Sequence, residues 1–254
     1  MTNSLTGTVA LVTGASSGIG EATARALAAE GAAVALVARR RERLEALAAE
    51  LERDGGRALA IEADITSEHE ARDAVERTVL KLGRLDTLIN NAGVMLLGPA
   101  VGAPLEEWER MVNINALGLL YTTHAALPHL LKAAEDGPRR VADVVNVSSV
   151  AGRVARSGSG VYNLTKFGVV AFGESLRQEV TRRHVRVSTV EPGAVETELT
   201  DHLRPEVFEQ MKQRFASMER LQSADIADAI AYVVTRPRHV AINEVLIRPT
   251  EQEM

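Results

Sequence analysis

The sequence predicts one α/β domain: a Rossmann-like, doubly wound parallel sheet of about seven strands with helices on both faces. Seven short apolar runs alternate with longer amphipathic segments along the 254 residues. Most runs are apolar on both faces, as a parallel strand buried between two helix layers requires. Repeated strand–helix alternation is typical of this fold. Right-handed crossovers bring the strands' carboxyl ends to one edge, where ligands bind.

The expected elements follow from the spacing of apolar residues. Strands are expected over residues 8–13, 32–38, 58–64, 85–91, 141–149, 185–193 and 241–247. Helical spacing predicts helices over residues 19–30, 40–53, 67–82, 105–133, 161–183 and 223–235. In the second helix, Leu44, Leu47 and Leu51 line one face, and Gly55 follows as a stop signal. No linker divides the pattern, so we expect one domain over residues 1–254.

Composition narrows the classes of function. The chain is 46% hydrophobic, has a formal net charge of −5 and contains no cysteine. An acidic chain without a dense basic stripe argues against nucleic acid as a partner. The lack of cysteine excludes disulfides and thiolate metal sites and fits a reducing, cytoplasmic location. Without a basic leader or an apolar run of ~18 residues, we expect neither a signal peptide nor a membrane span. The six histidines lack ligand spacing, so no metal is expected.

A glycine-rich turn follows the first expected strand. Gly14, Gly18 and Gly20 have the spacing GxxxGxG at a strand–helix junction. Such a turn lets backbone N–H groups approach a phosphate, and the helix N-terminus adds a favourable dipole. A tight turn that binds no ligand is the alternative.

The end of the second strand indicates which dinucleotide would bind. An acid there would bind a ribose 2′-hydroxyl, whereas arginine accommodates a 2′-phosphate. The chain has Arg39 and Arg40 and no acid. We therefore expect NADP(H), with Arg39 as the main phosphate partner and Arg40 assisting. The alternative is a charged first helical turn, although cations there oppose the helix dipole.

Tyr162 and Lys166 lie four residues apart, on one face of an expected helix. A nearby ammonium group favours phenolate and lowers a tyrosine pKa. A tyrosine tuned in this way acts as general acid in reduction and general base in oxidation. A surface helix that begins with an aromatic residue is the alternative. Polar residues after two buried strands, in SS at 148–149 and NNAG at 90–93, favour the catalytic interpretation.

These segments together resemble the short-chain dehydrogenase/reductase family, in its single-domain branch. The resemblance covers roughly residues 5–250. It rests on TGASSGIG at 13–20, NNAG at 90–93, NALG at 115–118, SS at 148–149, YNLTK at 162–166 and PGAVET at 192–197. Segments such as NNAGVMLLGP and IRPTEQ look similar to clavulanate (clavaldehyde) dehydrogenase-like NADPH reductases. Similar segments also occur in broad-specificity 3-hydroxy acid dehydrogenases.

The resemblance implies a role for each matching residue. Tyr162 would be the catalytic acid/base, and Lys166 would lower its pKa and bind the nicotinamide ribose. Ser149 would bind the substrate oxygen, because the family's serine falls thirteen residues before its tyrosine, as here. Asn115 would hold a proton-relay water. Cofactor contacts are implied for Gly14, Ser16, Ser17, Gly18, Ile19, Gly20, Arg39, Arg40, Asp64, Ile65, Asn91, Ala92, Gly93, Tyr162, Lys166, Pro192, Gly193, Val195 and Thr197, and substrate contacts for Met95, Ser149 and Tyr162.

The implied reaction is reversible hydride transfer between NADP(H) and a small carbonyl/alcohol substrate. Residues 196–221 are expected to form a substrate-binding lid, with an ordinary surface helix pair as the alternative. The long helices at 105–133 and 161–183 imply, by resemblance, a homotetramer or dimer. A non-catalytic NADP(H)-binding sensor is the rival class. The intact set of Ser149, Tyr162 and Lys166 argues against it.

Overall fold

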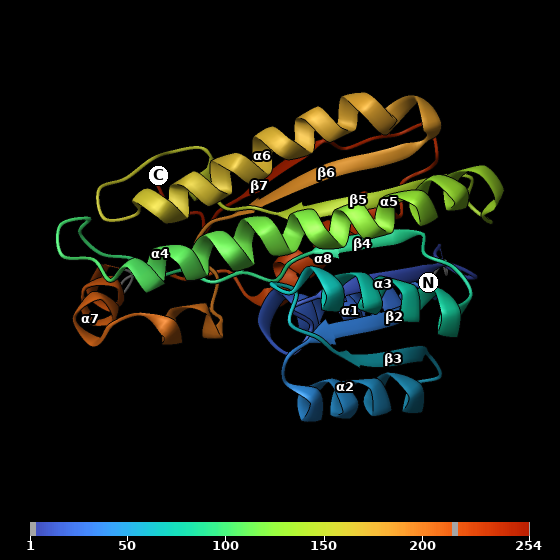
Figure 1. Cartoon of the computed structure of the whole chain (residues 1–254), viewed down its shortest axis with the longest axis horizontal. Helices are drawn as coiled ribbons and strands as arrows, with labels where there is room; N and C mark the ends of the chain where they lie inside the picture. Colours follow the sequence, from blue (N-terminus) through green and yellow to red (C-terminus); the bar gives the residue numbers. More distant parts are fainter. Residues whose placement is uncertain (1–3, 215–217, 254) are drawn as a thin grey trace.

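The computed structural model describes residues 4–214 and 218–253 and contains the expected parallel sheet. Within that part of the chain, seven strands lie in the order β3-β2-β1-β4-β5-β6-β7, and each neighbouring pair is parallel (Figure 1). They are β1 (Val9–Thr13), β2 (Ala33–Ala38), β3 (Arg57–Glu62), β4 (Thr87–Asn90), β5 (Ala142–Val147), β6 (Val185–Pro192) and β7 (Glu244–Ile247). All strands therefore end at the same edge of the sheet, as predicted.

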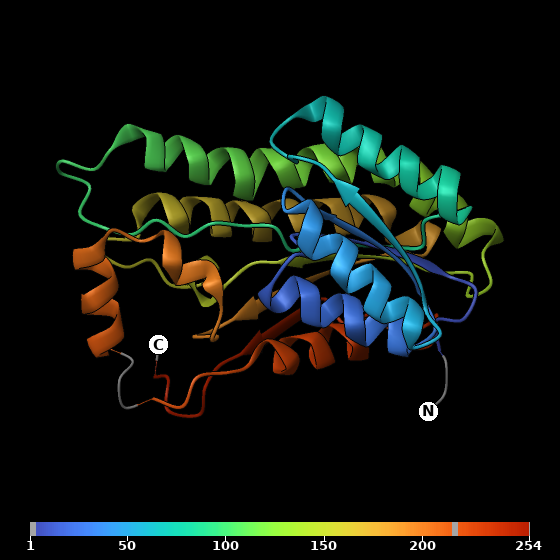
Figure 2. The same cartoon turned by 90° about the horizontal axis from the view of Figure 1, so that it is seen from below.

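Two layers of helices enclose the sheet (Figure 2). One face carries α1 (Gly18–Ala29), α2 (Arg41–Arg53) and α8 (Ser223–Val234), and the other carries α3 (Glu68–Leu82), α5 (Leu119–Asp136) and α6 (Gly160–Val180). Every residue of β1, β4, β5 and β6 is buried, so neither face of these strands is exposed to solvent. No helix in the described ranges has both the length and the apolar content to cross a membrane.

The segment predicted as one helix over residues 105–133 is divided. After α4 (Leu105–Val112), a π-helical turn covers Asn113–Gly118, and α5 then begins. The prediction of a continuous α-helix was wrong here, because apolar spacing does not distinguish the two hydrogen-bonding patterns. The turn lies against the loop after β3: a Cβ added at Gly118 would come 2.7 Å from the Ile65 Cδ1 atom. Single π-helical turns of this kind often occur at functional sites.

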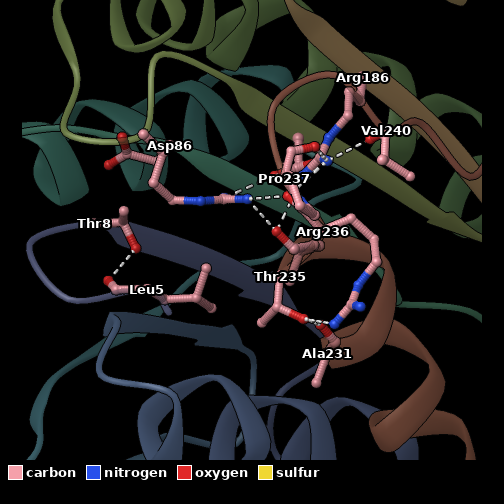
Figure 3. Close-up of polar contacts among 12 residues, drawn as sticks. Leu5, Thr8, Asp86, Arg186, Ala231, Thr235, Arg236, Pro237 and Val240 are labelled. Atoms are coloured by element: carbon pink, nitrogen blue, oxygen red, sulfur yellow. Dashed lines mark hydrogen bonds and ion pairs between the residues drawn. The ribbon is translucent and has the colours of Figure 1, made fainter. Parts of the chain in front are cut away.

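A buried polar network closes the amino-terminal edge of the sheet. Arg186 on β6 donates to both carboxylate oxygens of Asp143 on β5, at 2.7 and 3.0 Å. The same guanidinium group donates to the backbone carbonyls of Arg236 and Val240, at 3.1 and 2.7 Å, after α8 (Figure 3). Asp143 also accepts from Arg139 Nη1 at 3.1 Å, so removing Asp143 would leave the buried Arg186 guanidinium group without its carboxylate partner, whereas removing Arg186 would leave Asp143 with one arginine. We assign this network a structural role, since it lies at the opposite edge from the predicted site.

The segment expected as a lid contains two short helices. A 3₁₀ helix covers Glu198–His202, and α7 covers Pro205–Arg214. α7 lies at the same end of the molecule as the start of α4 (Figures 1 and 2), and Arg204 pairs with Glu107 at 3.2 Å. Residues 215–217 of the expected lid, like residues 1–3 and 254 of the expected domain, lie outside the described residues. A lid function stays a prediction.

Candidate active site

A large cleft of about 960 Å³ opens at the carboxyl edge of the sheet. Its walls come from the turns that follow β1, β2, β3, β4 and β5, from the start of α6 and from the segment after β6. All the residues for which cofactor or substrate contacts were predicted line it, except Gly20. Asn115 also lies outside the lining. The fold therefore gathers residues from most of the chain length into one cavity.

The glycine-rich turn is shaped by close backbone contacts. Gly14 and Gly18 have φ angles of +67° and +56°, in the left-handed region that favours glycine. A Cβ added at Gly14 would lie 2.9 Å from the Ala92 Cα, and one at Gly20 would collide with the Gly14 carbonyl. The turn thus lies against the loop after β4, with the N-terminus of α1 facing the cleft. This packing explains the glycines whether or not a phosphate binds.

The two arginines after β2 differ in their contacts. Arg40 donates through Nε and Nη2 to the Ser16 hydroxyl, at 3.0 and 2.9 Å, and through Nη2 to the Ser17 hydroxyl at 2.6 Å. Arg39 is exposed at the rim of the same cleft. Arg40 therefore lies against the turn, and the expected roles of Arg39 as main phosphate partner and Arg40 as assistant stay predictions. Arg43, one helical turn further on, also lines the cleft.

Tyr162, Ser149 and Lys166 meet on the opposite wall. The Tyr162 side chain is buried and shares a hydrogen bond with Ser149. The Lys166 Nζ lies 5.8 Å from the centre of the Tyr162 ring and donates to the backbone carbonyl of Val147 at 2.9 Å. The Ser148 hydroxyl instead donates to the backbone carbonyl of Lys166 at 3.0 Å. Of the two serines, Ser149 is therefore the one beside the phenol.

Burial sets the protonation of this pair. It raises the pKa of Tyr162 to about 12, because the hydrogen bond with Ser149 offsets only part of the desolvation. It lowers the pKa of Lys166 to about 8. The expected lowering of the tyrosine pKa is thus reversed in the protein alone, since desolvation disfavours both charged forms. At neutral pH the phenol holds its proton.

Asn115, in the π-helical turn, braces the loop after β4. Its Oδ1 accepts from the Val94 backbone N–H at 2.8 Å, and its Nδ2 donates to the Val94 carbonyl at 2.9 Å. The Nδ2 also donates to the Thr165 hydroxyl on α6 at 3.2 Å. A buried amide must find partners, and here the partners join two walls of the cleft. The predicted relay water at Asn115 stays a prediction.

Comparison with known proteins decides the family. The profile described as short chain dehydrogenase matches residues 8–207. The chain belongs to this family. An uncharacterised oxidoreductase of Staphylococcus aureus (strain USA300) is 34% identical over 245 residues, which cover 96% of this chain and 98% of that protein. The closed form of a serine dehydrogenase complexed with NADP⁺ has a TM-score of 0.88 at 31% identity, with 97% and 96% of the two chains covered. A 3-ketoacyl-(acyl-carrier-protein) reductase from Brucella melitensis complexed with NADH has a TM-score of 0.83 at 32% identity, with 96% and 98% covered.

Two further predicted residues of this short-chain dehydrogenase, Asp64 and Asn91, line the cleft with side chains that already make hydrogen bonds. The Asp64 Oδ1 accepts from the backbone N–H and hydroxyl of Thr66, at 3.0 and 2.8 Å, after β3. The Asn91 Nδ2 donates to the carbonyl of the last residue of β1 at 3.0 Å. Gln252 near the C-terminus accepts from the Ala194 N–H at 2.9 Å and so supports the PGAVET segment.

Sequence reasoning assigned no individual role to three residues of this region, although Glu198 lies in the segment expected as a lid. Arg43 had a usable signal, since it lies three residues after Arg40 on a helix face. Glu198 pairs with both of these arginines. Neither Glu198 nor Gln252 had a signal, because each contacts a partner that is distant along the chain. Among the described residues, no group of three His, Asp or Glu side chains could hold a metal ion.

Proposed function

We propose that this oxidoreductase transfers a hydride reversibly between NADP(H) and a small carbonyl/alcohol substrate. The observation that carries the proposal is the meeting of Tyr162, Ser149 and Lys166 in one cleft with the glycine-rich turn. The nicotinamide, when bound, supplies the hydride chemistry, and the protein supplies orientation and electrostatics.

In the proposed reduction, the protein stabilises and protonates the substrate oxygen. Ser149 and Tyr162 would both donate hydrogen bonds to that oxygen as negative charge develops on it. With its pKa raised to about 12, the phenol keeps its proton until the oxygen becomes basic enough to take it. The Lys166 ammonium group, close to the ring, would then stabilise the phenolate that remains. Oxidation would follow the same steps in reverse.

The cofactor preference is proposed from the rim of the cleft. The residues fit a dinucleotide, because the left-handed glycines and the N-terminus of α1 leave the backbone N–H groups accessible to a diphosphate. Arg40 and Arg43 would hold the 2′-phosphate, with Arg39 at the rim. The NADP⁺-bound serine dehydrogenase supports this choice, whereas the NADH-bound reductase shows that the fold alone does not impose it.

The substrate class is inferred from the wall beside Tyr162. The apolar side chains of Val94, Met95, Leu97 and Val154 line the cleft together with Tyr162. We therefore infer an aldehyde or ketone with an apolar body, and an aldehyde such as clavaldehyde is the candidate suggested by resemblance. A 3-hydroxy acid is the second candidate, because Arg110 and Arg156 line the same cleft. Arg153 is not available for a substrate anion, since it pairs with Glu191 and Glu244.

The proposed function is tested by following NADPH oxidation with a panel of aldehydes, ketones and 3-keto acids, with NADH in parallel. We expect turnover on at least one carbonyl, with kcat/KM at least about tenfold higher for NADPH because of the arginine contacts. Equal kcat/KM for the two cofactors would contradict the NADP(H) preference. Tight NADPH binding without turnover on any carbonyl would favour the sensor.

A cytoplasmic location is proposed only from the absence of cysteine.

A homodimer or homotetramer is proposed from apolar side chains exposed on the long helices. On α6, Leu164 is 65% exposed and Phe167 is 42% exposed. We expect light scattering to give the molar mass of a dimer or tetramer for the wild type. The double variant Leu164→Glu/Phe167→Glu should have a lower mass, because charged residues are disfavoured in the core of such an interface. The control is Leu80→Glu, since this leucine is 77% exposed on a different helix, α3. A wild-type monomer would contradict the proposal, as would a double variant of unchanged mass.

A further inference from the structure

Glu198 lies at the β2 side of the cleft, although it follows β6 in the sequence. One of its carboxylate oxygens accepts from Arg40 at 2.7 Å, and the other accepts from Arg43 at 2.6 Å. Arg40 is held at the same time by the hydroxyl groups of Ser16 and Ser17 in the glycine-rich turn. One carboxylate thus connects the cations at the rim of the cleft to the Glu198–His202 helix.

These two guanidinium groups are the ones to which the proposed function assigns the 2′-phosphate. A phosphate monoester carries a charge of about −1.5 to −2 at pH 7 and accepts from arginine as a carboxylate does. Arg43 and Arg40 lower the pKa of Glu198 to about 2, so this side chain is ionised at any pH at which the enzyme works. Two anions that require the same N–H groups repel each other.

We propose that Glu198 is a specificity-determining residue: it occupies the anion site formed by Arg40 and Arg43 and is displaced by the 2′-phosphate of NADP(H). This inference rests on the proposed function. The three side chains are 41–50% exposed, and ion pairs at such positions are individually weak, so a dianion can replace the carboxylate. A cofactor without the 2′-phosphate leaves Glu198 in place.

Displacement also connects the two ends of the cleft. Residues 198–202 form a short 3₁₀ helix that begins at the Thr197 cap, and all five line the cleft. In the cofactor-free protein, Glu198 ties this helix to Arg40 and Arg43. Binding of the 2′-phosphate breaks the ion pairs of Glu198 with these two arginines. The 3₁₀ helix before α7 is then free to adjust its position around a substrate. A cofactor that lacks the phosphate does not release it.

The first test measures binding to the full-length protein by calorimetry, with 2′,5′-ADP and 5′-AMP as probes. We expect Glu198→Gln to lower the Kd for 2′,5′-ADP about three- to tenfold, because two competing ion pairs are removed. The Kd for 5′-AMP should stay within about twofold. Glu196→Gln is the matched control, since Glu196 pairs with Arg220 and Gln222 rather than with Arg40 or Arg43. Its affinities should match those of the wild type.

The second test follows hydrogen exchange of the backbone amides of residues 198–203. Exchange in the wild type should become faster when 2′,5′-ADP is added and should stay unchanged with 5′-AMP. Slower exchange with 2′,5′-ADP would overturn the proposal, because Glu198 would then remain bound beside the phosphate. A Glu198→Gln protein that binds 2′,5′-ADP no more tightly than the wild type would overturn this inference alone. If neither protein binds 2′,5′-ADP, the proposed NADP(H) function fails and this inference fails with it.

Discussion

Replacement of Tyr162 by phenylalanine is expected to lower kcat for carbonyl reduction by NADPH at least about a hundredfold, because it removes the phenol that is the proposed proton donor, next to Ser149. The change removes one oxygen and leaves the ring packed against Val94, Leu96 and Met111. The fold and the dinucleotide contacts should therefore survive. Steady-state kinetics give kcat, and titration of NADPH fluorescence gives the Kd, which we expect to stay within about twofold of the wild type.

The control for this variant is Tyr232→Phe. Tyr232 lies on α8, is 56% exposed and is not among the residues that line the cleft, so its hydroxyl should not affect turnover. Full activity of Tyr162→Phe would exclude Tyr162 as the proton donor. Loss of NADPH binding together with turnover would instead assign Tyr162 to cofactor binding.

Lys166 is expected to make the stability of the cofactor-free protein increase between pH 8 and pH 10. Its pKa is about 8 in the folded protein, lowered by burial from an ordinary value of 10.5. Between these two values the unfolded chain binds more protons than the folded protein, so the free energy of unfolding rises with pH. A shift of this size corresponds to about 2–3 kcal/mol between pH 7 and pH 10. Tyr162, whose pKa is raised by burial, acts in the opposite direction only above about pH 10.

The measurement compares urea unfolding of the wild type and Lys166→Met from pH 7 to pH 10. Methionine has a similar length and cannot titrate, so the difference between the two proteins isolates the lysine from all other groups. The wild type should gain stability relative to the variant as the pH rises. A difference that stays constant over this range would show that burial does not lower the pKa of Lys166. Loss of the bond to the Val147 carbonyl shifts the variant by a pH-independent amount.

Most of the fold followed from local patterns. The seven strands appear within a few residues of the predicted ranges, because runs that are apolar on both faces must be buried between layers. The π-helical turn at Asn113–Gly118 could not be predicted, since its residues have the same apolar spacing as an α-helix. The 3₁₀ helix and α7 after β6 were also not assigned. That segment was predicted only as a lid or a surface helix pair.

The sequence by itself determined the elements of the sheet, the family, and the spacing that places Tyr162 and Lys166 on one helical face. These features depend on residues that are close along the chain. Only the tertiary structure decided that Arg40 contacts the turn and that Glu198 pairs with it, because these partners of Arg40 lie in other elements, 23 and 158 residues away along the chain. It also decided the direction of the Tyr162 and Lys166 pKa shifts, since desolvation depends on how completely the rest of the chain covers a side chain.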